Sequence, residues 1–284
     1  GILGFPLSHS ISPFIQQAAL DHYSLPIQYK TWPTTSEYLE SRINILRQEK
    51  FVGANVTIPH KESVMRCLDV IDGLAKRVGA VNTIVKDGGR LVGYNTDVHG
   101  FLTCLMNDVN FQVSGSSVLI LGAGGAARAA AFGLVDQDVG SLVIANRSLG
   151  RAQSLVRQLR NDVLNIKSVS IEDDILASIV PKVDLIVNAT SVGMGKGPMA
   201  DISPIKSKFI SSGTLVYDMI YNPVKTPLLM EASLVGAMTV GGLSMLVHQG
   251  AAGFELWTGR KAPIDLMRRA AENVMEASSS GALF

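Results

Sequence analysis

A glycine-rich turn between an apolar strand and an alanine-rich helix constrains the fold of this chain more than any other feature. Residues 117–121 (SVLIL) form an unbroken apolar run, and Gly-Ala-Gly-Gly-Ala-Ala follows at 122–127. In this setting Gly-x-Gly-x-x-Ala is typical of the turn that binds a dinucleotide pyrophosphate. Its glycines permit a tight turn and a close approach of backbone to phosphate, and the helix N-terminus favours an anion. The turn predicts a Rossmann domain that binds its cofactor at Gly122, Ala123, Gly124, Gly125 and Ala126, although the same turn also occurs without a ligand.

The residues after the next strand predict which dinucleotide binds. An NAD site usually carries Asp or Glu about 20 residues after the first glycine, where the carboxylate binds the ribose 2′-hydroxyl. Here the apolar run at 142–145 is followed by Asn146, Arg147 and Ser148, with Arg151 close behind. Guanidinium groups match phosphate geometry, and Ser148 can donate a further hydrogen bond to a 2′-phosphate. We therefore predict NADP rather than NAD, with incidental arginines at a solvated helix start as the alternative.

Short strands and helices alternate along the rest of the chain. We expect strands at 2–5, 27–32, 53–57, 80–85, 90–94, 117–121, 142–145, 168–171, 183–187, 215–218 and 237–240, and helices from Ser12-Pro13 onward and over 38–48, 64–70 and about 150–159. Ser12 is expected to cap its helix and Pro13 to occupy the first turn. Such alternation predicts βαβ units, and continuous apolar strands indicate sheets covered on both faces. The fold class is α/β, with a mainly parallel sheet in the N-terminal part and a Rossmann sheet in the middle.

Composition and charge exclude several other classes of protein. The chain has 284 residues, 47% of them hydrophobic and only 17% charged, so it can bury a large core and is not extensively disordered. Its net charge of +1 argues against nucleic-acid binding through broad phosphate neutralisation. The two cysteines, Cys67 and Cys104, support neither a disulfide framework nor a metal site, and no His, Cys and carboxylate cluster has metal-ligand spacing. We predict no metal and no nucleic-acid partner.

One segment has the length of a membrane span. Residues 232–254 contain no Asp, Glu, Lys or Arg over 23 positions. The segment holds five glycines together with His248 and Gln249, however, which favours a strand, a glycine turn and a buried helix. No signal peptide is visible, so we expect a cytoplasmic protein without a membrane partner.

Polar residues gather at the ends of three strands in the N-terminal region. Asn-Val-Thr-Ile-Pro-His-Lys at 55–61 ends one strand, Asn82-Thr83 interrupts the next, and Asn-Thr-Asp at 95–97 closes the third. This pattern is expected of a site at the carboxyl edge of a sheet. A lysine beside a carboxylate there can relay a proton to or from an alcohol or carbonyl. Spacing alone equally allows a surface lysine and an aspartate that caps a turn.

These segments, taken together and in order, resemble the shikimate dehydrogenase family, NADP-dependent enzymes that reduce 3-dehydroshikimate to shikimate in chorismate and aromatic amino-acid biosynthesis. The resemblance runs nearly from end to end. It is carried by 4–13 (GFPLSHSISP), 55–62 (NVTIPHKE), 79–83 (GAVNT), 95–97 (NTD), the glycine turn, 146–148 (NRS), 188–191 (NATS), 217–223 (YDMIYNP) and 246–250 (LVHQG).

The resemblance implies a role for each matching residue. Lys61 and Asp97 match the catalytic pair: Lys61 supplies the proton to oxygen, supported by Asp97, while the nicotinamide delivers hydride to C3 of 3-dehydroshikimate. The implied substrate ligands are Ser10 and Ser12 for the carboxylate, Thr57, Asn82, Asp97 and Gln249 for the ring hydroxyls, and Tyr221 at the domain cleft. Thr190, Met219 and Gly242 match the residues beside the nicotinamide.

The family fold implies two α/β domains around a deep cleft, with the first domain split by the second. We expect residues 1–97 plus 242–284 to bind substrate and 98–241 to bind NADP, in a monomer or homodimer. Two positions depart from the usual pattern, with Val98 instead of glycine after Asp97 and serine instead of threonine at Ser148.

Two alternatives remain open from the sequence. One is a quinate/shikimate dehydrogenase with relaxed cofactor use, which Ser148, Arg151 and the paired serines Ser10 and Ser12 oppose. The other is a ligand-binding regulator without turnover, which would be expected to lose Lys61 or Asp97, and both residues are present.

Overall fold

Two compact units divide the chain in the computed structural model, which describes residues 1–159, 165–172, 175–195 and 199–279. Unit 1 consists of Gly1–Phe101 with Leu246–Phe284, and unit 2 is Leu102–Met245. The sequence places the boundaries after residues 97 and 241. The structure has them slightly later, inside helices α4 (Asp97–Thr103) and α9 (Leu243–Thr258), which continue across both boundaries.

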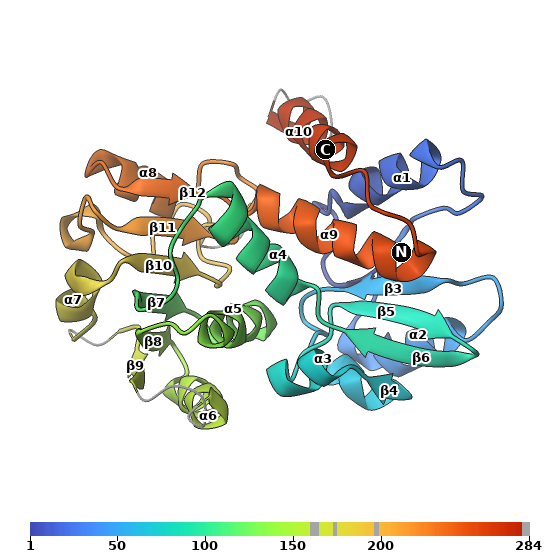
Figure 1. Cartoon of the computed structure of the whole chain (residues 1–284), viewed down its shortest axis with the longest axis horizontal. Helices are drawn as coiled ribbons and strands as arrows, with labels where there is room; N and C mark the ends of the chain where they lie inside the picture. The colour runs from blue at the N-terminus through green and yellow to red at the C-terminus, as the bar shows by residue number, and fades with distance from the viewer. Residues whose placement is uncertain (160–164, 173–174, 196–198, 280–284) are drawn as a thin grey trace. The chain divides into compact units, whose positions relative to one another are not determined.

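Unit 1 is built on a mixed six-stranded sheet (Figure 1). Its order is β2-β1-β3-β5-β6-β4, made of β2 (Thr31–Pro33), β1 (Ile2–Gly4), β3 (Gly53–Val56), β5 (Thr83–Asp87), β6 (Arg90–Tyr94) and β4 (Val70–Ile71). The pairs β1–β2, β1–β3 and β4–β6 are parallel, whereas β5 runs antiparallel to both β3 and β6. The β5–β6 pair is a hairpin, and its turn contains Gly88 and Gly89, both of which have positive φ.

Helices from both ends of the chain cover this sheet. They are α1 (Ser12–His22), α2 (Leu39–Ile45), α3 (Gly73–Val78), α9 and α10 (Ile264–Ser279). Helix α10 packs on α1, and the Trp257 Nε1 of α9 donates to the Ile84 carbonyl of β5 at 2.9 Å. The core of buried aliphatic residues includes Leu3, Leu39, Ile43, Ala54, Val56, Ile84 and Leu91. The C-terminal helices thus belong to the same unit as the first hundred residues, and Figure 1 shows α9 and α10 beside α1 and β3.

The predicted helix at 64–70 is wrong. The segment is a 3-10 helix over Ser63–Cys67 followed by strand β4, which pairs with β6. Asp69 holds the chain at this sheet edge, because its Oδ2 accepts from the Leu91 amide at 2.7 Å. The helix that follows is α3, which Asp72 caps by accepting from the Leu74 amide at 2.9 Å. Ser12 also differs from expectation: the cap position of α1 is Ile11, and Ser12 is the first helical residue.

Unit 2 is an all-parallel six-stranded sheet, as the glycine turn predicts. Its order is β12-β11-β10-β7-β8-β9, made of β12 (Met238–Val240), β11 (Leu215–Asp218), β10 (Leu185–Asn188), β7 (Ser117–Leu121), β8 (Ser141–Asn146) and β9 (Ile166–Ser170). The strand order reverses between β7 and β10. In open α/β sheets, ligands bind beyond the carboxyl ends of the strands at such a switch point.

The helices of unit 2 are α5 (Gly125–Asp136), α6 (Leu149–Leu159), α7 (Ile175–Ile179) and α8 (Pro227–Leu234). Leucines 119 and 121 of β7 pack with buried residues of α7 and α8 in one apolar cluster. Alanines 127, 129, 130 and 131 of α5 are fully buried, which allows that helix to pack closely on the sheet. Both faces are therefore covered, as the unbroken apolar strands predict.

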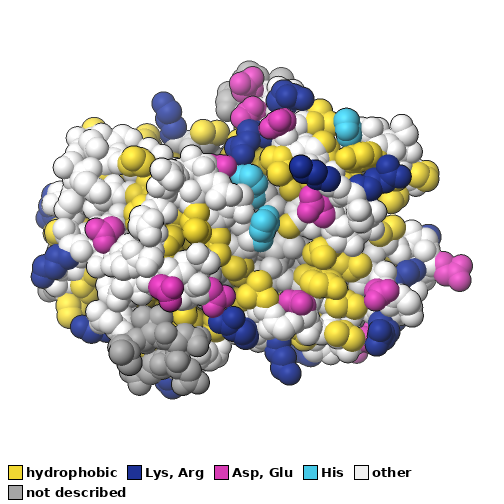
Figure 2. All heavy atoms as spheres, viewed as in Figure 1, with side chains coloured by type: hydrophobic (Ala, Val, Ile, Leu, Met, Phe, Trp, Pro, Cys, Tyr) yellow, Lys and Arg dark blue, Asp and Glu magenta, His cyan; other side chains and the backbone are white. Residues whose placement is uncertain are grey.

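The surface shows no extended basic region on the face drawn in Figure 2, where Lys, Arg, Asp and Glu side chains are interspersed. This agrees with the net charge of +1. Among the described residues, no helix has both the length and the apolarity needed to cross a membrane. The segment 232–254 is divided between the end of α8, strand β12 and helix α9.

Candidate active site

Three strands of unit 1 bring the predicted substrate residues to one edge of its sheet. Register pairs Asn55 of β3 with Thr83 of β5, and Thr83 with Tyr94 of β6. The end of β3, the start of β5 and the end of β6 therefore coincide. Since β1 is parallel to β3, the loop with Ser10 also leaves from this edge. The polar segments 55–61, 82–83 and 95–97 meet there, as their positions at strand ends predict.

Lys61 and Asp97 form an ion pair at this edge. The Lys61 Nζ lies 2.7 Å from Asp97 Oδ2, with side-chain exposures of 16% and 5%. Asp97 is the first residue of α4, where the helix N-terminus favours a carboxylate. Val98, the departure from the family pattern, is buried, and its amide donates to Asn95 Oδ1 at 3.2 Å, so the helix start is intact. The ammonium group retains two further N–H donors that can face a substrate oxygen.

Asn82 links this pair to Gln249 of α9. The Thr96 amide donates to Asn82 Oδ1 at 2.7 Å, which fixes the orientation of the side-chain amide. Its Nδ2 therefore donates to Asp97 Oδ1 at 2.9 Å and to Gln249 Oε1 at 3.2 Å. The structure thus brings Lys61, Asp97, Asn82 and Gln249 into one polar cluster, although Gln249 is 167 residues from Asn82 in the chain.

The remaining predicted substrate residues of unit 1 lie at the same edge, on two loops and at the first position of α1. Ser12 is buried at the start of α1, Ser10 precedes it, and Thr57 follows β3. The Ser10 Oγ is buried and has no hydrogen-bond partner among the described residues. A buried hydroxyl without a partner costs free energy, so this atom is suited to donate to a ligand oxygen such as a carboxylate.

The glycine turn of unit 2 lies at the switch point of its sheet. Gly122 follows β7 with φ +110°, and a Cβ on it would lie 3.0 Å from the carbonyl oxygen of Ala189, which follows β10. A Cβ at Gly124 would meet nothing within 4 Å, which leaves open space beside the N-terminus of α5. Gly124 is also the cap position of α5, and no side chain caps its amides. The turn therefore fits a bound pyrophosphate, and Ala123, Gly125 and Ala126 complete it.

The predicted 2′-phosphate residues follow β8 at the same sheet edge. Asn146 ends the strand, and its Nδ2 donates to the Ser148 carbonyl at 2.8 Å, which holds the turn before α6. Arg147, Ser148 and Arg151 are exposed around the start of that helix. Two guanidinium groups beside a helix N-terminus can bind a phosphate, and this turn carries no carboxylate that would repel it.

The other predicted cofactor residues follow β10, β11 and β12. Thr190 comes after β10, Met219 after β11 and Gly242 after β12, all at the carboxyl edge. The Gly242 amide donates to the Ile220 carbonyl at 3.0 Å, so two of these loops are joined. Tyr221, the predicted substrate contact of unit 2, is half-buried in the loop after β11.

Substitution of Gly242 by alanine is expected to disturb these loops. A Cβ there would lie 2.1 Å from the Met219 carbonyl oxygen, so one backbone segment must move. We expect a loss of about 1–3 kcal/mol in stability, as for overpacked sites, together with weaker NADPH binding. Thermal unfolding and a fluorescence titration measure both. Gly213→Ala is the matched control, since a Cβ there meets nothing within 4 Å; equal behaviour of the two variants would contradict the close-approach argument.

Asp218 is a buried carboxylate that the sequence motifs contain without assigning a role. Burial raises its pKa, and hydrogen bonds from Thr226, Ile220 and Asn188 oppose that shift in part. A carboxyl group whose pKa is higher in the folded than in the unfolded chain binds its proton more tightly when folded. Its contribution to stability is therefore present below the ordinary pKa of 3.8 and is lost as pH rises through the raised value.

The unsubstituted protein should therefore lose stability as Asp218 ionises, whereas Asp218→Asn should not, because the amide stays neutral. We expect the melting temperature of Asp218→Asn minus that of the unsubstituted protein to rise with pH across that window. Melting curves of both proteins from acidic to neutral pH measure the difference. A difference independent of pH would show that Asp218 does not titrate with a raised pKa.

Asn55 and Thr83 support Asn82, a role that the sequence did not assign to them. Asn55 Nδ2 donates to the Asn82 carbonyl at 3.3 Å, and Thr83 Oγ1 donates to Asn82 Oδ1 at 3.2 Å. The Tyr29 hydroxyl in turn donates to Asn55 Oδ1 at 2.6 Å. Asn55 and Thr83 lie inside the matching segments, so their side-chain types are a usable signal. Tyr29 lies outside them, and only the structure reveals it.

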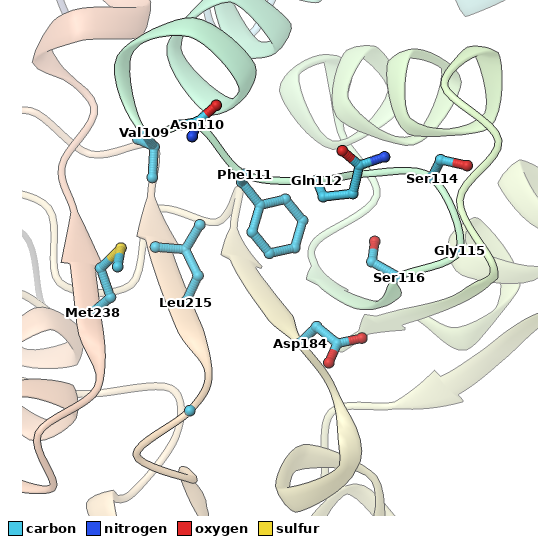
Figure 3. Close-up of a pocket in the computed structure, with 11 residues that line it drawn as sticks. Val109, Asn110, Phe111, Gln112, Ser114, Gly115, Ser116, Asp184, Leu215 and Met238 are labelled. Atoms are coloured by element: carbon cyan, nitrogen blue, oxygen red, sulfur yellow. The ribbon is translucent and has the colours of Figure 1, made fainter.

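One pocket of unit 2 lies away from every predicted site residue. Figure 3 shows it between the 109–116 segment and the starts of β10, β11 and β12, where Asp184, which directly precedes β10, Leu215 and Met238 line it. These strand starts form the amino edge of the parallel sheet, opposite the edge that carries the glycine turn. Among the described residues, no group of three or more His, Cys, Asp or Glu side chains is arranged to hold a metal ion.

Comparison with known proteins relates this chain to one enzyme family. Three family models match: the shikimate dehydrogenase substrate binding domain over residues 2–84, shikimate / quinate 5-dehydrogenase over 105–198, and the shikimate 5′-dehydrogenase C-terminal domain over 242–272. A protein of Moorella thermoacetica named shikimate dehydrogenase (NADP(+)) is 42% identical over 99% of this chain and 94% of its own length. The chain belongs to the shikimate dehydrogenase family.

Solved structures of shikimate dehydrogenases share the fold. One in complex with NADP⁺ is 37% identical, with a TM-score of 0.88 over 97% of this chain and 94% of that one. The enzyme of Thermus thermophilus in complex with NADP(H) and shikimate is 34% identical, with a TM-score of 0.84 over 96% and 97%. The predicted α/β fold class is confirmed for this shikimate dehydrogenase family member, with one mixed sheet and one parallel sheet of Rossmann type.

Proposed function

We propose that this chain is an NADP-dependent shikimate dehydrogenase, which interconverts shikimate and 3-dehydroshikimate in chorismate and aromatic amino-acid biosynthesis. The observation that carries the proposal is the Lys61–Asp97 pair at 2.7 Å, held by Asn82 beside Gln249. These four residues match the family motifs, and relatives near 40% identity over nearly the whole chain carry this name.

In the direction of reduction, the ring of 3-dehydroshikimate lies against the polar cluster of unit 1. The hydroxyls of Ser10 and Ser12 donate hydrogen bonds to the substrate carboxylate, and the side chains of Thr57, Asn82 and Gln249 bind ring hydroxyls. The unpartnered Ser10 Oγ supports this assignment. NADPH, when bound, would supply the hydride that C3 receives. Tyr221 is assigned to the substrate because it matches the family motif at 217–223.

Lys61 carries out the proton transfer. Its ammonium group donates a proton to the C3 oxygen as negative charge develops there, and in the oxidation direction the neutral amine takes that proton back. Asp97 holds the Lys61 Nζ in place by accepting its hydrogen bond at Oδ2, and Asp97 Oδ1 accepts from Asn82 Nδ2. The balance is one hydride and one proton added to the carbonyl, which gives the alcohol.

Cofactor choice follows from the turns of unit 2. The 122–126 turn would hold the pyrophosphate, and Asn146, Arg147, Ser148 and Arg151 would hold the adenosine 2′-phosphate. Thr190, Met219 and Gly242 would hold the nicotinamide half. Exposed arginines with a hydroxyl, in place of a carboxylate, support NADP over NAD.

The proposal is tested by tracing the hydride. The protein is incubated with 3-dehydroshikimate and NADPH that carries deuterium at the transferred position, and the product is analysed by mass spectrometry and NMR. The expected product is shikimate with deuterium at C3. Binding of both ligands without oxidation of NADPH would instead support a ligand-binding regulator.

We further propose residues 1–97 with 242–284 as the substrate-binding part and 98–241 as the NADP-binding part, in a cytoplasmic monomer or homodimer. The division of the chain into units at nearby positions supports the first point. Light scattering of the purified protein measures the mass in solution.

A further inference from the structure

The buried carboxylate of Asp218 is not used by any step above. It ends β11, is 0% exposed, and accepts three hydrogen bonds. The Asn188 Nδ2 and the Ile220 amide donate to Oδ1 at 3.0 and 3.1 Å, and the Thr226 hydroxyl donates to Oδ2 at 2.6 Å. Within the described part of the chain, no Lys or Arg pairs with it. Burying a carboxylate without a cation costs free energy, and the three neutral donors offset part of that cost.

These donors come from three different segments. Asn188 ends β10, Ile220 lies in the loop after β11, and Thr226 caps α8 by accepting from the Leu229 amide at 3.3 Å. One carboxylate therefore ties together the carboxyl ends of two neighbouring strands and the helix that follows them.

The same contacts extend to each predicted nicotinamide residue. Asn188 Oδ1 accepts from the amide and the hydroxyl of Thr190, at 3.1 and 2.7 Å. The Met219 amide donates to the Asn188 carbonyl at 3.0 Å, and the Gly242 amide donates to the Ile220 carbonyl at 3.0 Å. Thr190, Met219 and Gly242 are thus each one hydrogen bond from a residue that Asp218 holds directly.

We propose that Asp218 is a positioning residue, which fixes the loops after β10, β11 and β12 in the arrangement that binds the nicotinamide half of the cofactor. It contacts neither cofactor nor substrate and acts through Asn188 and Ile220. The inference rests on the proposed function, because that function places the nicotinamide beside these loops.

The geometry distinguishes two substitutions at this position. In Asp218→Asn, the amide oxygen can accept from Asn188 and Ile220 as Oδ1 does, while its NH₂ group faces the Thr226 hydroxyl, which can accept. In Asp218→Leu, both acceptors are lost in a side chain of similar shape. We expect Asp218→Asn to keep the affinity for NADPH within about twofold, and Asp218→Leu to weaken it by about tenfold or more.

A ligand without nicotinamide separates positioning from general damage. Dissociation constants are measured by calorimetry for NADPH and for 2′,5′-ADP, which carries the adenosine with its 2′- and 5′-phosphates and lacks the nicotinamide half. Asp218→Leu should weaken NADPH and leave 2′,5′-ADP unchanged within about twofold, and should also lower kcat.

Thr226→Val is the matched structural control. It removes the donor to Oδ2 and the cap of α8 but leaves both bonds to Oδ1. We expect a lower melting temperature with unchanged affinity for NADPH. Should Asp218→Leu fail to fold, Asn188→Ala removes the link to Thr190 while leaving Ile220 and Thr226 on Asp218, and it should show the same selective loss.

The outcomes are distinct. Equal losses for NADPH and 2′,5′-ADP, or a Thr226→Val variant that loses NADPH affinity as Asp218→Leu does, would overturn the positioning role and leave the proposed function standing. A foldable Asn188→Ala with unchanged NADPH affinity would do the same. If the unsubstituted protein binds no NADPH, the proposed function falls, and the inference falls with it.

Discussion

Replacement of Lys61 by alanine is expected to lower kcat by about 10²–10⁴, the range typical for loss of a general acid or base. The KM for shikimate should change by only a few-fold, because proton transfer stabilises the transition state rather than the bound substrate. Steady-state kinetics with saturating NADP⁺ measures both constants. The substitution leaves Asp97 buried without its cation, so the melting temperature is measured alongside to show that the variant is folded.

Lys76→Ala is the matched control for this variant. Lys76 lies on α3 in the same unit, is exposed, and belongs to no part of the proposed site. Its kcat should equal that of the unsubstituted protein. A folded Lys61→Ala variant that retains kcat would show that another group transfers the proton.

The second large effect is expected from Arg147→Ala on the choice of cofactor. A charge-assisted hydrogen bond to phosphate contributes about 1.5–3 kcal/mol, which corresponds to roughly 10- to 100-fold in kcat/KM for NADPH. NADH lacks the 2′-phosphate, so its kcat/KM should stay within about twofold. Because Arg147 is exposed, solvent screening places the expected loss at the lower end of that range.

Arg157→Ala provides the comparison on the same helix, since Arg157 is exposed near the other end of α6. It should leave both cofactors unaffected. Equal losses for NADPH and NADH in Arg147→Ala would contradict the assignment of Arg147 to the 2′-phosphate and would indicate a general disturbance of the turn.

Local sequence was sufficient to predict the Rossmann part of the fold. The apolar run at 117–121 and the glycine turn after it specify a buried parallel strand, a tight turn and a helix start, and the structure has β7 and α5 there. Gly122 shows why: its φ of +110° and its approach to the Ala189 carbonyl are requirements that glycine meets and that other residues meet poorly. This requirement concerns only the backbone around Gly122, so the residue pattern of this short segment was enough to predict the turn.

Long-range pairing was less predictable. The 64–70 segment has a helical pattern of apolar residues, yet the edge strand β4 forms because Asp69 and Ile71 meet β6, about 20 residues further along the chain. The pattern of residues in each segment predicts a local element, but it does not predict that β4 pairs with β6. The same holds for Asp218, whose role depends on donors from β10, the following loop and α8.

The polar cluster of unit 1 lies between these cases. Its strand-end positions predicted one sheet edge, whereas the contact of Asn82 with Gln249 depends on the return of α9 to the first unit. The orientation of the Asn82 amide depends on the backbone of Thr96, which no residue pattern encodes. Family resemblance supplied what spacing alone left undecided, since spacing equally allowed Lys61 and Asp97 to be surface residues.

The most direct test of the central claim is a steady-state assay that crosses shikimate and quinate with NADP⁺ and NAD⁺. The expected result is a kcat/KM for shikimate with NADP⁺ that exceeds each of the other three combinations by at least about tenfold. Comparable values for quinate, or for NAD⁺, would contradict the specificity argued here for the serine pair and for the Arg147 turn. Absence of turnover in all four combinations would contradict the proposed activity itself.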